Sequence, residues 1–231
     1  MADGRPAAAG WWMAALAGLV GVLIGAVAMA AASGYFVRSY LLEHPEVLPE
    51  AMERLQQRET AQAVEQNRAA LETPFHGAWA GAADADVVLV EFYDYACGFC
   101  RQMNPVVERL IAEDPKLKVV WREFPVLGPA SEEAAVASLA AAEAGRFKAF
   151  HERLFELGRP SAETIAAARA AVNLPEPTLT PAYEQELRRN YQLAEALRAN
   201  GTPTFVVGDQ VFRGAVGYEV LKEAIGAARR N

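Results

Sequence analysis

The chain contains two cysteines, Cys97 and Cys100, and only two residues separate them in the stretch EFYDYACGFCRQM. Cysteine acts as a nucleophile or metal ligand in its thiolate form, and two thiols one helical turn apart can also close a disulfide. A purely structural disulfide explains this spacing poorly, because closing so short a loop restricts the unfolded chain very little. The pair therefore indicates reversible redox chemistry.

The same C-x-x-C spacing also occurs in metal sites. Structural zinc needs four ligands, but the sequence has no third cysteine, and its three histidines are scattered: His44, His76 and His151. We therefore predict no metal site of this kind and no organic cofactor. Copper remains an alternative, because two thiolates are soft ligands that suit Cu(I) in a copper-binding or copper-tolerance protein.

The segments around the cysteines have the pattern of a strand followed by a helix. Residues 87–90 form a continuous apolar run, typical of a strand buried on both faces. Apolar residues then recur at helical spacing, namely Met103, Val106, Val107, Leu110 and Ile111. Cys97 should thus lie at the start of a helix, where unpaired backbone N–H groups and the helix dipole stabilise a thiolate and lower its pKa.

Glu91 lies six residues before Cys97 on the predicted strand. We expect its side chain to point beneath the start of the helix, where burial would raise the pKa of the carboxyl group. Such an acid could pass protons to or from Cys100. A solvent-exposed acid at the edge of the strand is the alternative.

Four further residues are candidates for binding a substrate. Gly98 and Phe99 separate the cysteines and set the surroundings of the attacking sulfur. Thr202 and Pro203 precede an apolar strand, and proline suits the first position of a strand because it has no N–H to donate. A cis bond between them would turn the polar backbone of Thr202 toward the cysteines, giving an extended peptide an edge to bind.

The remaining pattern predicts an α/β fold. Leu117, Val119 and Trp121 alternate along a second strand, and the order strand, helix, strand favours a parallel pair. Residues 129–200 are rich in helix formers, with predicted N-caps at Ser131, Ser161 and Thr180. A hairpin around Gly208-Asp209 and an amphipathic helix over 217–230 follow.

The N-terminal third has a different composition. After a tail of residues 1–10, residues 11–32 carry no charge and are long enough as a helix to cross a hydrocarbon core of about 30 Å. We predict an uncleaved anchor, with a cleaved signal or a buried helix of a soluble protein as the alternatives. Either an anchor or a signal would export the rest of the chain.

Residues 33–73 are predicted as a helical stalk whose apolar positions fall at helical spacing, namely Leu41, Leu48, Met52 and Leu55. They indicate either a solvated spacer or a self-association segment. The net charge of -7 argues against nucleic acid as a partner.

Several segments together resemble the DsbA family of thioredoxin-fold thiol–disulfide oxidoreductases. They are EFYDYACGFC, the helical insert, GTPTFVV and RGAVGYEVLKEAI, and the resemblance covers about residues 75–230. It implies a thioredoxin-like domain over 74–231 with a helical insertion over about 129–200. It also implies the roles of the candidate residues: Cys97 as nucleophile, Cys100 as resolving thiol, Glu91 as buried acid and Pro203 as a cis-proline preceded by Thr202.

The chain departs from well-known DsbA oxidases, which carry a Pro-His pair where this sequence has Gly98-Phe99. Without that histidine one source of thiolate stabilisation is missing, so the resemblance does not fix the oxidising strength. The YDYACGFC context and the preceding helical segment are more similar to the ScsC- and Com1-like branch. Some members of that branch oligomerise through their N-terminal region and shuffle incorrect disulfides.

These observations predict a thiol–disulfide oxidoreductase in the periplasm or cell envelope. Its expected partners are exported polypeptides with cysteines and a membrane redox partner, DsbB-like or DsbD-like. The alternative within the same class is an oligomeric isomerase that a membrane reductase keeps reduced.

Overall fold

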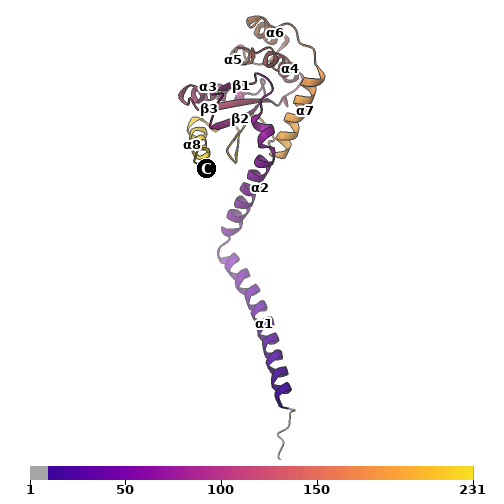
Figure 1. Ribbon diagram of the computed structural model, residues 1–231, viewed down its shortest axis with the longest axis vertical. Helices are drawn as coiled ribbons and strands as arrows, with labels where there is room; N and C mark the ends of the chain where they lie inside the picture. Colours follow the sequence, from indigo (N-terminus) through magenta and orange to yellow (C-terminus); the bar gives the residue numbers. More distant parts are fainter. Residues whose placement is uncertain (1–9, 231) are drawn as a thin grey trace, which may run out of the picture. The chain divides into compact units, whose positions relative to one another are not determined.

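The computed structural model describes residues 10–230. Along the chain they divide into two compact units, the first ending at Gln56 and the second beginning at Gln57. Figure 1 shows the elements. In chain order they are α1 (Gly10–Glu43), α2 (Val47–Glu72), β1 (Trp79–Gly81), β2 (Val87–Tyr93), α3 (Gly98–Glu113), β3 (Leu117–Glu123), α4 (Pro129–Glu143), α5 (Phe147–Leu157), α6 (Ala162–Ala171), α7 (Pro181–Ala196), β4 (Thr204–Val207), β5 (Gln210–Arg213) and α8 (Tyr218–Ala228).

The strands form one mixed sheet in the order β1-β3-β2-β4-β5. β2 and β3 are parallel, and their register runs from Val87 opposite Leu117 to Tyr93 opposite Glu123. The other neighbouring strands are antiparallel. Because α3 connects the two parallel strands, the predicted order of strand, helix and strand is confirmed. The parallel pair therefore brings its carboxyl end to the start of α3.

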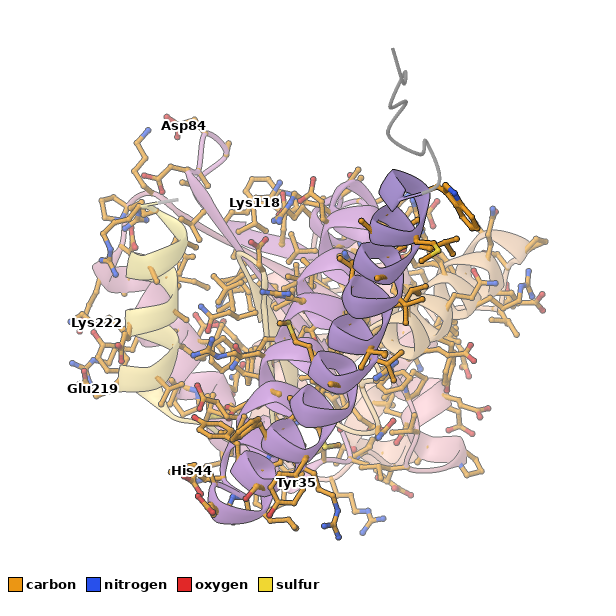
Figure 2. The ribbon with its side chains drawn as sticks, turned by 90° about the horizontal axis from the view of Figure 1, so that it is seen from below. Tyr35, His44, Asp84, Lys118, Glu219 and Lys222 are labelled. Carbon is orange, nitrogen blue, oxygen red and sulfur yellow. The ribbon has the colours of Figure 1, made fainter. Side chains whose placement is uncertain are left out.

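Both faces of the sheet are covered. Leu89, Leu117 and Val119 pack on one face in a core that includes residues of α3, α8 and the helices α4 to α6. The opposite face belongs to a second core, in which Val64 and Leu71 of α2 take part. Figure 2 shows Glu219 and Lys222 on the outer side of α8, away from the sheet.

The boundary between stalk and domain differs from the one predicted at residue 74. The compact unit already begins at Gln57, inside α2. Val64 and Leu71 are each 1% exposed, because they cover apolar side chains of β2, β3 and β4. The second half of α2 is thus part of the domain, and only the first half is a candidate stalk.

The predicted insert is present as α4 to α7, and two of its predicted N-caps are confirmed. Ser161 and Thr180 each accept a backbone N–H from the first turn of the helix that follows. The prediction for Ser131 is wrong: Gly128 is the N-cap and Ser131 is buried inside α4. Pro129 explains the earlier start, because proline fits the first position of a helix without losing a hydrogen bond.

The sequence also predicted the hairpin of β4 and β5, in which Gly208 adopts a φ of 57°. It did not predict β1, which has only three residues and therefore shows no alternation. Gly81 is required at its end, because a Cβ there would lie 2.2 Å from the carbonyl oxygen of Leu117.

In the N-terminal unit, α1 continues beyond the predicted span as far as Glu43. By length and composition it could cross a membrane, with a mean hydropathy of 2.3 over an 18-residue window. The chain then leaves the helix over residues 44–46, because Pro45 has no N–H and disfavours helical geometry at His44. The predicted apolar stripe is therefore divided: Leu41 belongs to α1, whereas Leu48 and Met52 belong to α2.

Candidate active site

Cys97 is the N-cap of α3, with φ -77° and ψ 118°, as the strand-to-helix pattern predicted. The segment before it is held by Asp94, a buried carboxylate that sequence reasoning missed. Asp94 accepts the N–H of Ala96 at 2.7 Å and those of Val126 and Leu127 at 2.9 and 3.0 Å. One carboxylate thereby fixes both the segment before Cys97 and the loop after β3.

The surroundings of Cys97 favour a thiolate. A hydrogen bond from the Cys100 thiol is the largest influence, and hydrogen bonds from the Thr202 side chain and the backbone N–H groups of Cys100 and Phe99 add to it. They outweigh partial burial and lower the pKa of Cys97 to about 5. When protonated, the thiol donates instead to the carbonyl oxygen of Thr202 at 3.2 Å.

Cys100 differs strongly from its neighbour. It lies in the first turn of α3 with 1% of its surface exposed. Burial raises its pKa well above that of free cysteine, and its hydrogen bond to Cys97 and the nearby Glu91 carboxylate raise it further. Both residues are free thiols in the structure. Of the two thiols, Cys97 therefore ionises far more readily, and Cys100 keeps its proton.

Glu91 lies on β2 beneath the start of α3, and it is buried with 3% of its surface exposed. The indole N–H of Trp121 on β3 donates to Oε2 of Glu91 at 2.9 Å. Burial raises the pKa of this carboxyl group to about 8, although the bond from Trp121 lowers it and Glu108 and Cys97 raise it slightly. Glu91 thus holds a proton at neutral pH, and the alternative of a solvent-exposed acid does not apply.

The structure brings the other predicted residues to the same place. The Thr202-Pro203 bond is cis, and it presents the Thr202 carbonyl to Cys97. Gly98 is exposed and Phe99 is 61% exposed, so both are open to a binding partner. The loop braced by Asp94 adds two exposed apolar side chains, those of Val126 and Leu127.

A buried polar cluster supports the segment before Cys97 from the helical insert. The Tyr95 hydroxyl lies 3.0 Å from Ser138 Oγ on α4 and 3.1 Å from His151 Nδ1 on α5. Burial lowers the pKa of His151 well below its usual value, so the ring is neutral. No sequence pattern indicates this cluster, because its members are brought together only by the packing of the insert on the sheet.

Comparison with known proteins gives the family. The family model described as DSBA-like thioredoxin domain matches residues 88–226. The N-terminal domain of the copper resistance protein ScsC matches residues 34–62. Disulfide bond formation protein D of Bacillus subtilis is 26% identical over 163 residues, covering 63% of this chain and 73% of that protein.

Two solved structures extend the likeness. A linker-deletion mutant of ScsC from Proteus mirabilis is 30% identical, with a TM-score of 0.72 over 83% of this chain and 90% of that one. The thiol–disulfide exchange protein alpha-DsbA2 from Wolbachia pipientis is 25% identical, with a TM-score of 0.69 over 75% of this chain and 97% of that one.

The Na⁺/H⁺ antiporter NhaA 3 of Salinispora tropica is 31% identical over 157 residues, which are 64% of this chain and 24% of that protein. The chain thus spans about a quarter of the length of this curated relative. With its mixed sheet, its helical insert and the family match over 88–226, the chain belongs to the DSBA-like family of thioredoxin-fold thiol–disulfide oxidoreductases.

Proposed function

We propose that this protein exchanges disulfide bonds in exported polypeptides through Cys97 and Cys100. The observation that carries the proposal is the contrast between the two thiols. Hydrogen bonds at the start of α3 lower the pKa of Cys97 to about 5, whereas burial keeps Cys100 protonated. A pair with one stable thiolate and one buried thiol suits reversible exchange.

In the oxidising direction, a client thiolate attacks Sγ of Cys97 in the Cys97–Cys100 disulfide. The S–S bond breaks, a mixed disulfide forms at Cys97, and Cys100 leaves as a thiolate that takes the proton of Glu91. A second client thiolate then attacks the client sulfur of the mixed disulfide. Cys97 leaves as a thiolate, so the client gains a disulfide and the enzyme is reduced by two electrons.

The proposed binding edge for the client consists of Gly98, Phe99, Thr202 and Pro203. An extended peptide could bind to the Thr202 backbone while Phe99 supplies exposed apolar surface. Phe124 and Phe205 do not contribute to this edge, because they are 7% and 0% exposed and pack in the core.

Replacement of each cysteine tests the mechanism. The Cys100→Ser variant should accumulate mixed disulfides between Cys97 and client proteins. The Cys97 thiolate can still attack client disulfides, but the Cys100 thiol, which would attack the mixed disulfide at Cys97 in the reducing direction, is gone. Non-reducing gels and mass spectrometry of the envelope fraction would detect these complexes. The Cys97→Ser variant is the matched control and should form none. Absence of complexes from Cys100→Ser would contradict a protein substrate, and exchange activity in Cys97→Ser would contradict the mechanism.

The apolar N-terminal helix and the ScsC-like relatives indicate that the chain is a protein of the cell envelope. We further propose that α1 remains as the anchor and that a membrane protein of DsbB-like or DsbD-like type exchanges electrons with Cys97. Support for an anchor comes from aromatic residues toward both ends of the apolar run: Trp12 at one end, and Tyr35 and Phe36 at the other. Tryptophan and tyrosine favour the two interfaces of a bilayer.

A second candidate function, disulfide isomerisation by an oligomer, is favoured by α2. Leu48, Met52 and Leu55 are 51%, 71% and 57% exposed, and the ScsC match covers this segment. An isomerase would be kept reduced by its membrane partner, so the redox state of Cys97 in cells separates the two candidates. The ScsC match lies in residues 34–62, which contain neither cysteine, so it gives no support to copper binding at the thiols.

A further inference from the structure

The position of Glu91 raises the question of how its proton reaches solvent. The residue is 3% exposed, and the active-site side of it is occupied by Cys97 and Cys100. In the mixed disulfide, a client is bound covalently to Cys97. An exit through the cysteines would then be closed, at the stage when Glu91 has given its proton to Cys100.

A second carboxylate, that of Glu108, lies close enough to Glu91 to raise the pKa of its carboxyl group. Glu108 on α3 has one oxygen, Oε1, that is buried and makes no hydrogen bond in the described part of the chain. Its other oxygen, Oε2, binds Lys148 Nζ of α5 at 2.5 Å. The Glu108 side chain is 29% exposed and that of Lys148 is 31% exposed. One end of this carboxylate therefore faces the interior and the other reaches the surface.

Trp121 lies between Glu91 and the lysine that binds Glu108. Its indole N–H donates to Glu91 at 2.9 Å, and Lys148 Nζ lies 6.0 Å from the centre of the Trp121 ring. Glu108 lies close enough to Glu91 for its charge to act on that carboxyl group. Glu91, Trp121, Lys148 and Glu108 thus share one corner, where β2, β3, α3 and α5 meet.

We propose that Glu108 is a relay residue that carries protons between Glu91 and solvent by a route that does not pass the two cysteines. After Cys100 has taken the proton of Glu91, a proton from solvent binds Glu108 and passes to the Glu91 carboxylate. No electrons move in this step. The proposal rests on the proposed function of Glu91 and adds a route that stays open in the mixed disulfide.

The charged and titratable groups around Glu91 come from two helices and from the segment that precedes α3. Cys100 and Glu108 belong to α3, and Lys148 and the neutral His151 belong to α5. Tyr95 and Cys97 belong to the segment between β2 and α3. On the sheet, the neighbours of Glu91 are Trp121 and Phe205, neither of which carries a charge. Of these groups, Glu108 has an oxygen turned inward and a surface contact, which makes it the one suited to relay a proton.

The test follows the ionisation of Glu91 directly in the full chain in detergent. The infrared band of the protonated carboxyl group reports Glu91, and a Glu91→Gln variant assigns the band. After a pH jump through the pKa of about 8, Glu91 should lose its proton at least about tenfold more slowly in the Glu108→Gln variant than in wild type. A tenfold effect is smaller than the rate enhancement that a positioned acid or base typically supplies. Glu152→Gln is the matched control, since Glu152 also binds Lys148 but is 44% exposed.

Two further arms separate a relay from a structural role. In Glu108→Ala, added formate or acetate should restore the rate, because a small acid can occupy the relay position. Alkylating Cys97, whose thiolate reacts selectively, should leave the wild-type rate unchanged. Equal rates in Glu108→Gln and wild type would overturn the proposal, as would a rate that collapses when Cys97 is blocked. Client trapping by Cys100→Ser is independent of these results, so failure of the relay and failure of the proposed function are distinguishable.

Discussion

Three residues of the candidate active site differ in what surrounds them, and those differences support the roles proposed for them. Cys97 receives hydrogen bonds from Cys100, from Thr202 and from the backbone at the start of α3. Cys100 and Glu91 are enclosed by the core, where charge is unfavourable. As a result, the Cys97 thiol ionises easily, whereas the Cys100 thiol and the Glu91 carboxyl group beside it hold their protons.

Glu91 gives a prediction about stability and pH. Burial raises the pKa of its carboxyl group from 4.5 to about 8, so between these values the native protein keeps a proton that the unfolded chain has lost. The free energy of unfolding must then decrease as pH rises through this window. Glu91→Gln removes the free-energy cost of burying an ionisable carboxyl group. It should raise the melting temperature relative to wild type at pH 8 but not at pH 4. Thermal unfolding at both pH values checks this, and an equal difference at the two would contradict a buried acid with a raised pKa.

The sequence predicted some of these residues and not others, for a physical reason. Cys97, Cys100 and Glu91 lie within ten residues on one strand and the helix after it, so local pattern places them. Asp94 and Tyr95 lie in the same stretch, but their partners, Leu127 and His151, come from distant elements. A local pattern carries no information about such contacts.

Among the elements, α2 shows how one buried cation fixes a helix to the domain. Arg122 of β3 is 1% exposed. It donates to the carbonyl oxygens of Ala70 and Leu71, which lie in the last turn of α2 and have no partner within the helix, and to that of Thr73 just after it. It also binds Glu186 of α7 at 2.7 Å. The sequence showed only a charged residue in an apolar strand, and the predicted boundary at residue 74 missed this attachment.

Replacing Arg122 should therefore loosen α2. Arg122→Met leaves Glu186 as an unpaired buried charge, which costs about 3–5 kcal/mol in comparable buried pairs. We expect a lower melting temperature and faster hydrogen exchange of the amides in residues 64–72, with little change in the strands. Arg188→Met is the control, because the Arg188 side chain is 64% exposed. Uniform exchange changes across the domain would contradict a specific role at α2.

At the scale of the whole molecule, the first half of α2 carries exposed apolar side chains. They are those of Leu48, Met52 and Leu55. If these residues join copies of the chain, Leu48→Glu combined with Met52→Glu should convert an oligomer to a monomer in detergent without altering the rate of exchange by Cys97. Sedimentation of the full chain measures this. A wild-type monomer would contradict the isomerase candidate.

The anchor makes a separate prediction. If α1 stays attached, the full chain should remain with membranes after an alkaline wash and keep its own N-terminal residues. Fractionation after the wash checks the first point, and intact-mass measurement of the purified protein checks the second. A mature chain that begins beyond residue 32 would show instead that the segment is a cleaved signal, without affecting the chemistry of Cys97.

The central claim is that Cys97 is a thiolate at neutral pH, and titration of the reduced wild-type protein tests it most directly. The ultraviolet absorbance of the thiolate, or the rate of alkylation, should follow a single ionisation with a pKa near 5. The Cys97→Ser variant should lack this transition. A transition at about 8.5, where free cysteine ionises, would contradict the account.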